Sequence, residues 1–531
     1  MSIKRFQSLQ SLVATRAVLV GVMLILLVSV EPAEAQVFST PVNLSGNSST
    51  STTGQIGVDG QGNISVVWSD NAPGNFDLFF RRSADGVNFS APLNLSSNTG
   101  NSFRPEMAID SQGSLNVVWH DNSPGNFDVF FSRSTDGVNF SAPVNLSANS
   151  GDSLFPQIAV DGQGRVNVVW QDNTLGNAEI FFRQSADGVS FSAAVNVSAN
   201  TGSSLFSKIA VDGEGNISLL WSDDTPGNSD IFFSSSVDGV NFSAPLNLSA
   251  NSGSSFFETM VADDLGNVHV VWSDDTPGNF DIFYRRSSDG VTFSPRVNVS
   301  GNTGDSFAPR VGVDNQGTTS VVWHDSSPGN FDILYRHSAD GMNFTALVNL
   351  SANTGDSVFP RMAVDGLGIV HVTWRDDTPG NVDILYRRST PQGVNFSTPV
   401  NISANAGTSF AQRMALDGQG GVYAVWIDTT PGNSEIFFSR ALNLSKAIQD
   451  LISAVVALNL KQGISNSLDA KLEAAVEVLD DLNENNNVAA INALQAFINS
   501  VEAQRGIHIP ETDADALIAA AEAIIALLTG S

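Results

Sequence analysis

The sequence of 531 residues contains no cysteine, so neither a disulfide bond nor a lipid-modified cysteine is available to it. Positive charge is also scarce, since 25 Lys and Arg stand against 54 Asp and Glu and give a formal net charge of −29. Such a charge opposes binding to nucleic acid or anionic lipid, because their phosphates would be repelled. The 45 Gly and 33 Phe that are present suit many short strands joined by tight turns.

Long apolar runs are missing after residue 35, and the run near the N-terminus is short. Basic residues precede this run, residues 17–30, and Ala33 and Ala35 follow it at the spacing of a cleavage site. The run is shorter than the ~20 residues that a membrane-spanning helix needs. We therefore expect residues 1–35 to be a secretory signal peptide and a protein beginning at Gln36 to be secreted or associated with the cell surface.

A repeat of 51 residues organises most of the chain. All eight tryptophans belong to it, with a last step of 52 residues: Trp68, Trp119, Trp170, Trp221, Trp272, Trp323, Trp374 and Trp426. Each unit, such as residues 155–205, contains four short β-rich segments separated by turn clusters. Four antiparallel strands per unit are typical of a propeller blade, so the sequence predicts a mainly β, eight-bladed β-propeller.

The two ends of the repeat indicate how the ring closes. Residues 38–45, FSTPVNLS, resemble the fourth strand of a unit, but no first three strands precede them. The eighth unit runs through Trp426 and Glu435 and ends without a fourth strand of its own. We expect the N-terminal strand to complete the eighth blade, because this removes the open edge of the ring. The predicted propeller then occupies residues 36–445.

A second motif, Ser-x-Asp-Gly-x-x-Phe, lies between the third and fourth strands. Its aspartates are Asp85, Asp136, Asp187, Asp238, Asp289 and Asp340. The motif resembles the Asp-box (BNR) repeats of sialidases and related propellers, although it is one residue shorter and carries Phe instead of Trp. The seventh unit, residues 389–393, lacks the Asp. The resemblance implies a structural role, in which the carboxylate binds N–H groups of its own turn on the face away from the active site.

On the opposite face, the loop between strands two and three is nearly invariant within the chain. Each copy keeps Trp-x-Asp, Gly-Asn and a closing acid. Loops rich in oxygen suit Ca²⁺, so calcium is the one cofactor considered, with the candidate ligands Asp70, Asp77, Asp121 and Asp128. The alternative, which we favour, is that these acids cap turns, because no EF-hand-like ligand spacing is present.

One position on the predicted innermost strand breaks the repeat. Four residues before the first-strand aspartate, the units carry Gln55, Glu106, Gln157, Lys208, Thr259, Arg310, Arg361 and Arg413. Because blades are radial, the three arginines should converge near the mouth of the axial channel, where guanidinium groups suit a carboxylate. The sialidase resemblance implies the same role, since sialidases bind the substrate carboxylate with an arginine triad. The alternative is that the arginines lie on a solvated rim.

Catalytic residues are harder to find. A sialidase needs a Tyr nucleophile paired with Glu, and an Asp as acid and base. Tyr284, Tyr335 and Tyr386 replace Phe on the third strand, which indicates packing, and no Tyr–Glu pair stands out. The six histidines show no metal-ligand spacing. We therefore nominate no catalytic residue.

After Ser445 the sequence becomes rich in Ala and Leu, with helical periodicity. Helices are expected at residues 446–458, 467–482, 488–504 and 514–528. Residues 458–509 resemble the FIMAH domain, which ends many large exported prokaryotic proteins. The resemblance implies that residues 446–531 present or attach the protein outside the cell; the alternative is a plain four-helix spacer.

The regularity of the repeat favours recognition over catalysis, because enzymes place asymmetric catalytic groups on such scaffolds and here nearly every loop copies its neighbour. We predict an exported, non-catalytic recognition or adhesion protein. Its expected partner is an extracellular glycan or protein, which it binds as a monomer. The alternatives are a glycoside hydrolase of the sialidase type and a structural component of a matrix or surface layer.

Overall fold

The computed structural model describes residues 36–441 except 264, 277 and 379, residues 444–480 and residues 486–529. The expected signal peptide, residues 1–35, lies outside the described residues, so cleavage and export stay predictions. Within the described helices, none combines the length and the apolar character needed to cross a membrane.

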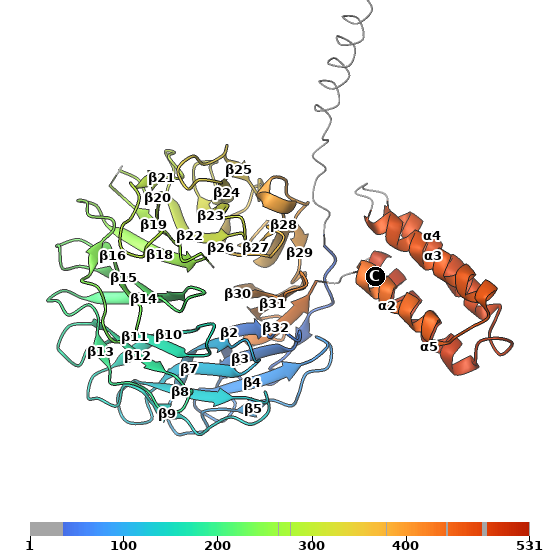
Figure 1. Ribbon diagram of the computed structural model, residues 1–531, viewed down its shortest axis with the longest axis horizontal. Coiled ribbons are helices and arrows are strands. Elements are labelled where there is room, and N and C mark those ends of the chain that lie inside the picture. The colour runs from blue at the N-terminus through green and yellow to red at the C-terminus, as the bar shows by residue number, and fades with distance from the viewer. Residues whose placement is uncertain are drawn as a thin grey trace, which may run out of the picture.

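Eight four-stranded antiparallel sheets surround a central axis (Figure 1), which confirms the predicted eight-bladed propeller. The first four blades, each given from the inner to the outer strand, are β2 (Ser51–Val58), β3 (Ile64–Asp70), β4 (Asp77–Ser83) and β5 (Leu93–Asn94); β6 (Ser102–Ile109), β7 (Leu115–Asp121), β8 (Asp128–Ser134) and β9 (Val144–Asn145); β10 (Ser153–Val160), β11 (Val166–Asp172), β12 (Glu179–Ser185) and β13 (Val195–Asn196); β14 (Ser204–Val211), β15 (Ile217–Asp223), β16 (Asp230–Ser236) and β17 (Leu246–Asn247).

The next three blades keep this order, and the eighth combines strands from both ends of the propeller. They are β18 (Ser255–Ala262), β19 (Val268–Asp274), β20 (Asp281–Ser287) and β21 (Val297–Asn298); β22 (Ser306–Val313), β23 (Thr319–Asp325), β24 (Asp332–Ser338) and β25 (Val348–Asn349); β26 (Ser357–Val364), β27 (Val370–Asp376), β28 (Asp383–Arg388) and β29 (Val400–Asn401); β30 (Ser409–Leu416), β31 (Val422–Asp428), β32 (Glu435–Arg440) and β1 (Val42–Asn43). Each fourth strand is only two residues long.

The hydrophobic core of the propeller is divided among the blade interfaces. At the first interface, Val67 and Phe80 of one blade pack against Val117 and Trp119 of the next, and all four side chains are buried. Six of the eight second strands, such as ISVVWSD in β3, are buried along their whole length, because each lies between two strands and two neighbouring blades. Every tryptophan of the repeat is at most 1% exposed, which explains its regular spacing.

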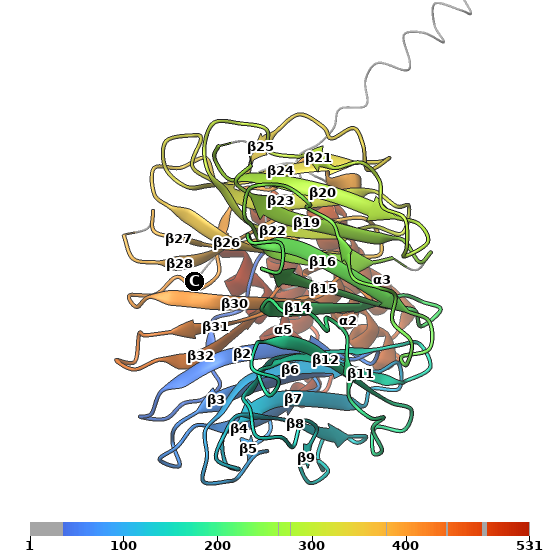
Figure 2. The same ribbon diagram turned by 90° about the vertical axis from the view of Figure 1, so that its left-hand side faces the viewer.

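The N-terminal strand closes the ring, as the sequence predicted. In the eighth blade β1 is antiparallel to β32, with Val42 opposite Phe438, and Leu44 is fully buried beside Phe438. The hydroxyl of Ser45 donates to Glu435. Figure 2 shows the ring from its edge, where β30 to β32 lie next to β2 and β3 and the first strands run side by side.

Every first strand contains a β-bulge. In β2 the pairing with β3 shifts register between Thr52 and Gln55, and the residue inside the shift, Thr53, has a φ of 49°. Bulges re-aim side chains and are frequent next to functional sites. The eight bulge residues, all with positive φ, are Thr53, Arg104, Phe155, Phe206, Phe257, Ala308, Phe359 and Ala411.

Four helices follow the propeller: α2 (Leu444–Ala457), α3 (Gln462–Asp480), α4 (Asn486–Glu502) and α5 (Glu511–Thr529). They pack on one another in a bundle (Figure 1) around the buried side chains of Leu472, Leu494 and Phe497. The predicted number and order of helices agree with the structure. The second helix begins at Gln462 rather than at residue 467, because Gly463 is tolerated in its first turn, where backbone N–H groups have no intrahelical partner.

Candidate functional site

The candidate site lies at one end of the propeller axis, where the first strands begin. Ser51 at the start of β2 pairs with Asp70 at the end of β3, so this end also carries the loops between strands two and three. The bulge residues form one ring here, which we call the rim. The position two residues further along each first strand forms a second ring, the axial ring, with Gln55, Glu106, Gln157, Lys208, Thr259, Arg310, Arg361 and Arg413.

The structure brings the three predicted arginines into one electrostatic cluster. Arg310, Arg361 and Arg413 lie on the innermost strands of three consecutive blades, and their side chains are partly exposed. Burial lowers the pKa of Arg310 to about 10, with a contribution from the charge of Arg413, and lowers that of Arg361 well below its ordinary value. An arginine side chain keeps its positive charge in proteins. The three guanidinium groups therefore repel one another.

Two further charged residues of the axial ring face this cluster. Glu106 accepts a hydrogen bond from Nε2 of Gln157 at 3.2 Å. Burial raises the pKa of Glu106, while the charges of Arg413, Lys208 and Arg361 oppose the shift. Lys208 donates from Nζ to the carbonyl oxygen of Phe206 at 3.2 Å, and burial lowers the pKa of its amine. Charges from opposite sides of the ring thus act on one another.

Glu258 is a buried carboxyl that sequence reasoning did not place at the site. It follows the bulge residue Phe257, is 3% exposed, and accepts a hydrogen bond from the Ser222 hydroxyl at 3.0 Å. Its Oε1 has no hydrogen-bond partner among the described residues. Burial raises the pKa of Glu258, and the nearby charge of Lys208 works against this shift. Glu258 is therefore a local counter-charge for Lys208.

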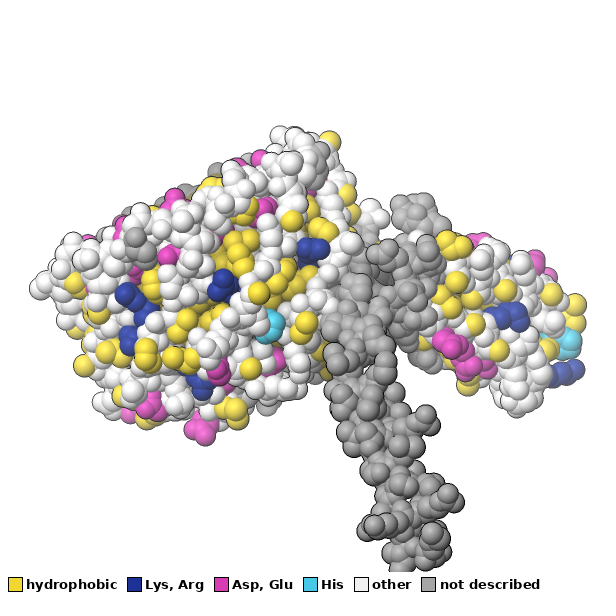
Figure 3. Space-filling model, turned by 90° about the horizontal axis from the view of Figure 1, so that it is seen from above, with side chains coloured by type: hydrophobic (Ala, Val, Ile, Leu, Met, Phe, Trp, Pro, Cys, Tyr) yellow, Lys and Arg dark blue, Asp and Glu magenta, His cyan; other side chains and the backbone are white. Residues whose placement is uncertain are grey.

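The charge balance at the axis is the reverse of that of the whole chain. Lys208, Arg310, Arg361 and Arg413 supply four positive charges against the carboxyl groups of Glu106 and Glu258, which leaves a balance of +2 even when both are ionised. The whole sequence carries −29. The outer surface is also uneven, since the side seen in Figure 3 has hydrophobic and basic side chains along its middle and acidic ones towards its margins.

The rim contains aromatic and cationic side chains that the sequence analysis missed. Phe206, Phe257 and Phe359 are each about half exposed, at 50%, 52% and 47%. The guanidinium carbon of Arg104 lies 5.0 Å from the ring centre of Phe155, whose ring centre is 5.8 Å from that of Phe206. The sequence could have revealed the rim, because the residue type at this position differs between repeat units, as it does at the axial-ring position that carries the arginines.

The acids of the loops between strands two and three are occupied by donors from the protein. Asp70 accepts from the hydroxyl of Ser51 at 2.7 Å, the side chain of Asn47 at 2.8 Å and the N–H of Ala72 at 2.8 Å. Equivalent Ser and Asn donors serve Asp77, Asp121 and Asp128. The described residues include no group of three or more His, Asp or Glu arranged to hold a metal ion. Turn capping, the interpretation favoured from the sequence, stays the prediction for these acids, and calcium binding stays its alternative.

The six Asp-box carboxylates lie in the turns that follow the third strands. Asp85 accepts N–H groups from Val87 and Asn88, both at 2.8 Å, and these bonds hold its pKa well below the ordinary value. The bonds recur at Asp136, Asp187, Asp238, Asp289 and Asp340. In the seventh blade a short 3₁₀ helix, η1 (Pro391–Gly393), replaces the turn. These aspartates organise their own turns, at the opposite end of the third strands from the loops after strand two.

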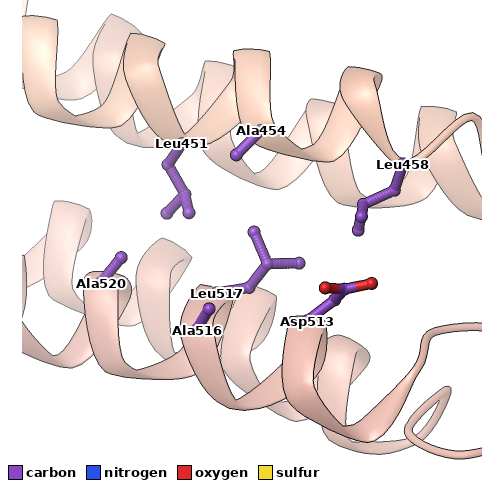
Figure 4. A pocket seen from close by; sticks show the side chains of 7 residues that line it. All are labelled: Leu451, Ala454, Leu458, Asp513, Ala516, Leu517 and Ala520. Atoms are coloured by element: carbon purple, nitrogen blue, oxygen red, sulfur yellow. The ribbon is translucent and has the colours of Figure 1, made fainter.

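The helical bundle also contains a groove. It has a volume of about 340 Å³ and lies between α2 and α5 (Figure 4). Leu451, Ala454 and Leu458 line one side, and Ala516, Leu517, Ala520 and Asp513 line the other. With an apolar lining and a single carboxylate, it lacks the convergent charges of the axial ring.

Comparison with known proteins gives similarity to solved structures only. No protein-family model matches the chain, and no curated protein matches it. One similar structure is a protein of unknown function from Dyadobacter fermentans, with 17% identity, a TM-score of 0.35, and coverage of 56% of this chain and 97% of that chain. Another is an ulvan lyase, a polysaccharide lyase, with 9% identity, a TM-score of 0.43, and coverage of 77% and 94%. A third is an α-L-arabinofuranosidase from Fusarium graminearum, with 13% identity, a TM-score of 0.36, and coverage of 70% and 99%. Likenesses this distant do not bear on the residues of the site.

Proposed function

We propose that this protein is an exported, non-catalytic recognition protein, and that its axial ring binds an extracellular glycan through a carboxylate group. The observation that carries the proposal is the cluster of Arg310, Arg361 and Arg413 in a chain with a strongly negative net charge. Without a ligand these guanidinium groups repel one another. A bound carboxylate relieves that repulsion and accepts charge-assisted hydrogen bonds from them.

The positions of the tyrosines favour binding over sialidase-type hydrolysis. Tyr284, Tyr335 and Tyr386 are fully buried in the blade interfaces, so their hydroxyl groups are not available to a ligand. Tyr423 donates its hydroxyl to Asp417 at the far end of a first strand from the bulge. None of these four residues is placed to be a nucleophile beside the arginine cluster.

Hydrolysis is the second candidate function, and one observation favours it. Burial raises the pKa of the Glu106 carboxyl, although the charge of Arg413 opposes the shift. A raised pKa is a property that a general acid needs. A structural role in a matrix or surface layer is a further alternative, but it would not explain the charged residues of the axial ring. Attachment through the helical domain and export by residues 1–35 belong to the same proposal.

The first experiment measures binding of sialic acid, galacturonate and their neutral counterparts by calorimetry. Changing Arg361 to Ala should weaken binding of the acidic sugars by about 1.5–3 kcal/mol, the value of a hydrogen bond to a charged group. Arg361→Lys should restore only part of this, because an ammonium group cannot pair in bidentate fashion. Arg165 is the matched control, since it pairs with Asp161 in a turn away from the axial ring.

Two results would overturn the proposal. Equal affinity for acidic and neutral sugars, unchanged by the arginine substitutions, would exclude the carboxylate site. Turnover of fluorogenic sialosides, abolished by Glu106→Gln, would favour the hydrolase over the recognition protein.

A further inference from the structure

The exposed phenylalanines are confined to one place. Among the described residues, four phenylalanine side chains are exposed: Phe206, Phe256, Phe257 and Phe359. All four lie at or beside the bulges of first strands, at the end of the axis that carries the arginine cluster. Large aromatic side chains left in water forgo the stabilisation that burial would give them, so such a concentration marks an interaction surface.

The fold itself does not require phenylalanine at these positions. Phe206 and Phe257 both have a φ of 57°, a conformation that bulky residues rarely adopt. In the sixth and eighth blades the equivalent residues are Ala308 and Ala411, with φ values of 48° and 55°. Because alanine occupies the same backbone conformation in the same protein, the aromatic rings serve something other than the bulge.

The rim divides into two sectors. Phe155, Phe206 and Phe257 lie on three consecutive blades and form an aromatic arc. On the next three blades the arginine cluster lies in the axial ring, and two of its members, Arg310 and Arg413, have only alanine at the rim position of their own strands. Phe359 is the rim residue of the blade between them, so the cationic sector is open at Ala308 and Ala411 on either side of one aromatic ring, and the aromatic arc lies on the three preceding blades.

We propose that the aromatic arc is a stacking subsite for the sugars adjoining the one bound by the arginines, so that the ligand is a segment of an acidic polysaccharide rather than a single terminal sugar acid. This inference rests on the proposed function. A pyranose ring presents an apolar C–H face that packs on an aromatic ring, and its burial contributes favourable free energy. The carboxylate of one unit binds in the cationic sector while neighbouring units cover the arc.

Polar groups of the axial ring at the start of the aromatic arc match hydroxyl groups. Glu106 and Gln157 of the axial ring are partly exposed and offer acceptors to ligand O–H donors. A ligand that combines carboxylates, apolar faces and many hydroxyl groups is an acidic glycan. An acidic peptide lacks the hydroxyl donors, and it is the competing occupant that the experiment excludes.

The test titrates the full protein with oligogalacturonates from the monomer to the hexamer, and with oligoglutamate of matched charge. In the unchanged protein, affinity should rise at least about tenfold from monomer to tetramer, as aromatic contacts are added. The double variant Phe206→Ala with Phe257→Ala should lose this dependence on length and bind the monomer within about twofold of the unchanged protein. Phe257→Tyr should retain the dependence, because its ring still stacks.

A control keeps the result specific to the arc. Leu367 is 74% exposed in the turn between β26 and β27, at the other end of the axis, and Leu367→Ala should change nothing. The phenylalanine variants should unfold at the same temperature as the unchanged protein, because Ala308 and Ala411 already occupy the equivalent bulge positions. An unchanged unfolding temperature excludes a folding defect.

The outcomes separate this inference from the proposed function. The stacking subsite is overturned if the double variant keeps the dependence on length, or if oligoglutamate binding depends equally on the phenylalanines. The proposed function stands in either case if binding of the monomer still requires Arg361. Absence of binding at every length overturns both.

Discussion

Two regions of each blade follow opposite rules. In the loop after the second strand, all eight blades repeat one arrangement, in which a buried Asp accepts from a Ser and an Asn of the preceding connection. At the axial ring the eight copies carry five different residue types. All eight blades meet only at the axis, so different residues at equivalent positions there combine into one site. Different residues at equivalent positions elsewhere would lie at eight separate places on the surface.

The largest effect should come from the closure of the ring. Deleting residues 38–45 removes the fully buried Leu44 and exposes the edge of β32. We expect aggregation, or a loss of about 5 kcal/mol or more in the free energy of unfolding, because a buried leucine alone is worth several kcal/mol. Chemical denaturation measures this. Thr40→Ala, at an exposed position in the same segment, is the control, and a deletion variant as stable as the control would contradict closure.

The second test compares the invariant loop with the axial ring directly. Asp172 accepts from Ser153 at 2.7 Å, Asn149 at 2.6 Å and the indole N–H of Trp170 at 3.2 Å. Asp172→Ala leaves these donors without a partner and should cost about 2–4 kcal/mol of stability. Arg361→Ala, measured in the same denaturation experiment, should change stability by less than about 0.5 kcal/mol. Similar losses in both variants would contradict the division between structural and functional positions.

A pH titration sharpens the comparison at Glu106. Its pKa is raised in the folded protein, so the stability that it contributes is complete below its ordinary value of 4.5 and is lost as the pH rises through the raised value. Protonation also removes a negative charge from the axial ring. Affinity for an acidic sugar should therefore increase as the pH is lowered through this raised pKa, while the sugar carboxylate stays ionised. Calorimetry on Glu106→Gln should give a flatter profile; an unchanged profile would assign the effect to another group.

Calcium should have the smallest effect. Because Asp70, Asp77, Asp121 and Asp128 already accept hydrogen bonds from neighbouring side chains, excess Ca²⁺ should leave the melting temperature within about 1 °C of its value in chelator. A rise of several degrees that Asp121→Asn removes would instead make these loops metal sites.

The sequence predicted those parts of the molecule that symmetry controls. Eight evenly spaced tryptophans and an isolated fourth strand were sufficient for the number of blades and for closure. The convergence of Arg310, Arg361 and Arg413 followed because equivalent positions on radial blades lie around the same axis. Whether that cluster binds a ligand stays a prediction.

The bulges account for what the sequence did not reveal. Phe257 lies in a β-rich segment, where alternation gives no reason to expect a half-exposed ring. The register shift between Phe256 and Thr259 turns Phe257 outward and Glu258 into the interface with the preceding blade. Such a shift depends on contacts between strands, so a single unit read by itself does not predict it.

Closure by the N-terminal strand also sets the order in which the chain can fold. Ser45 and Glu435, joined by a hydrogen bond in the eighth blade, are 390 residues apart in sequence. Joining such distant segments costs loop-closure entropy that no contact returns until the eighth blade forms, and contacts of this separation are slow to make. The first seven blades consist of consecutive strands and can form in turn as local units. We therefore expect the eighth blade to be the last to form, and its assembly to limit the rate at which the ring closes.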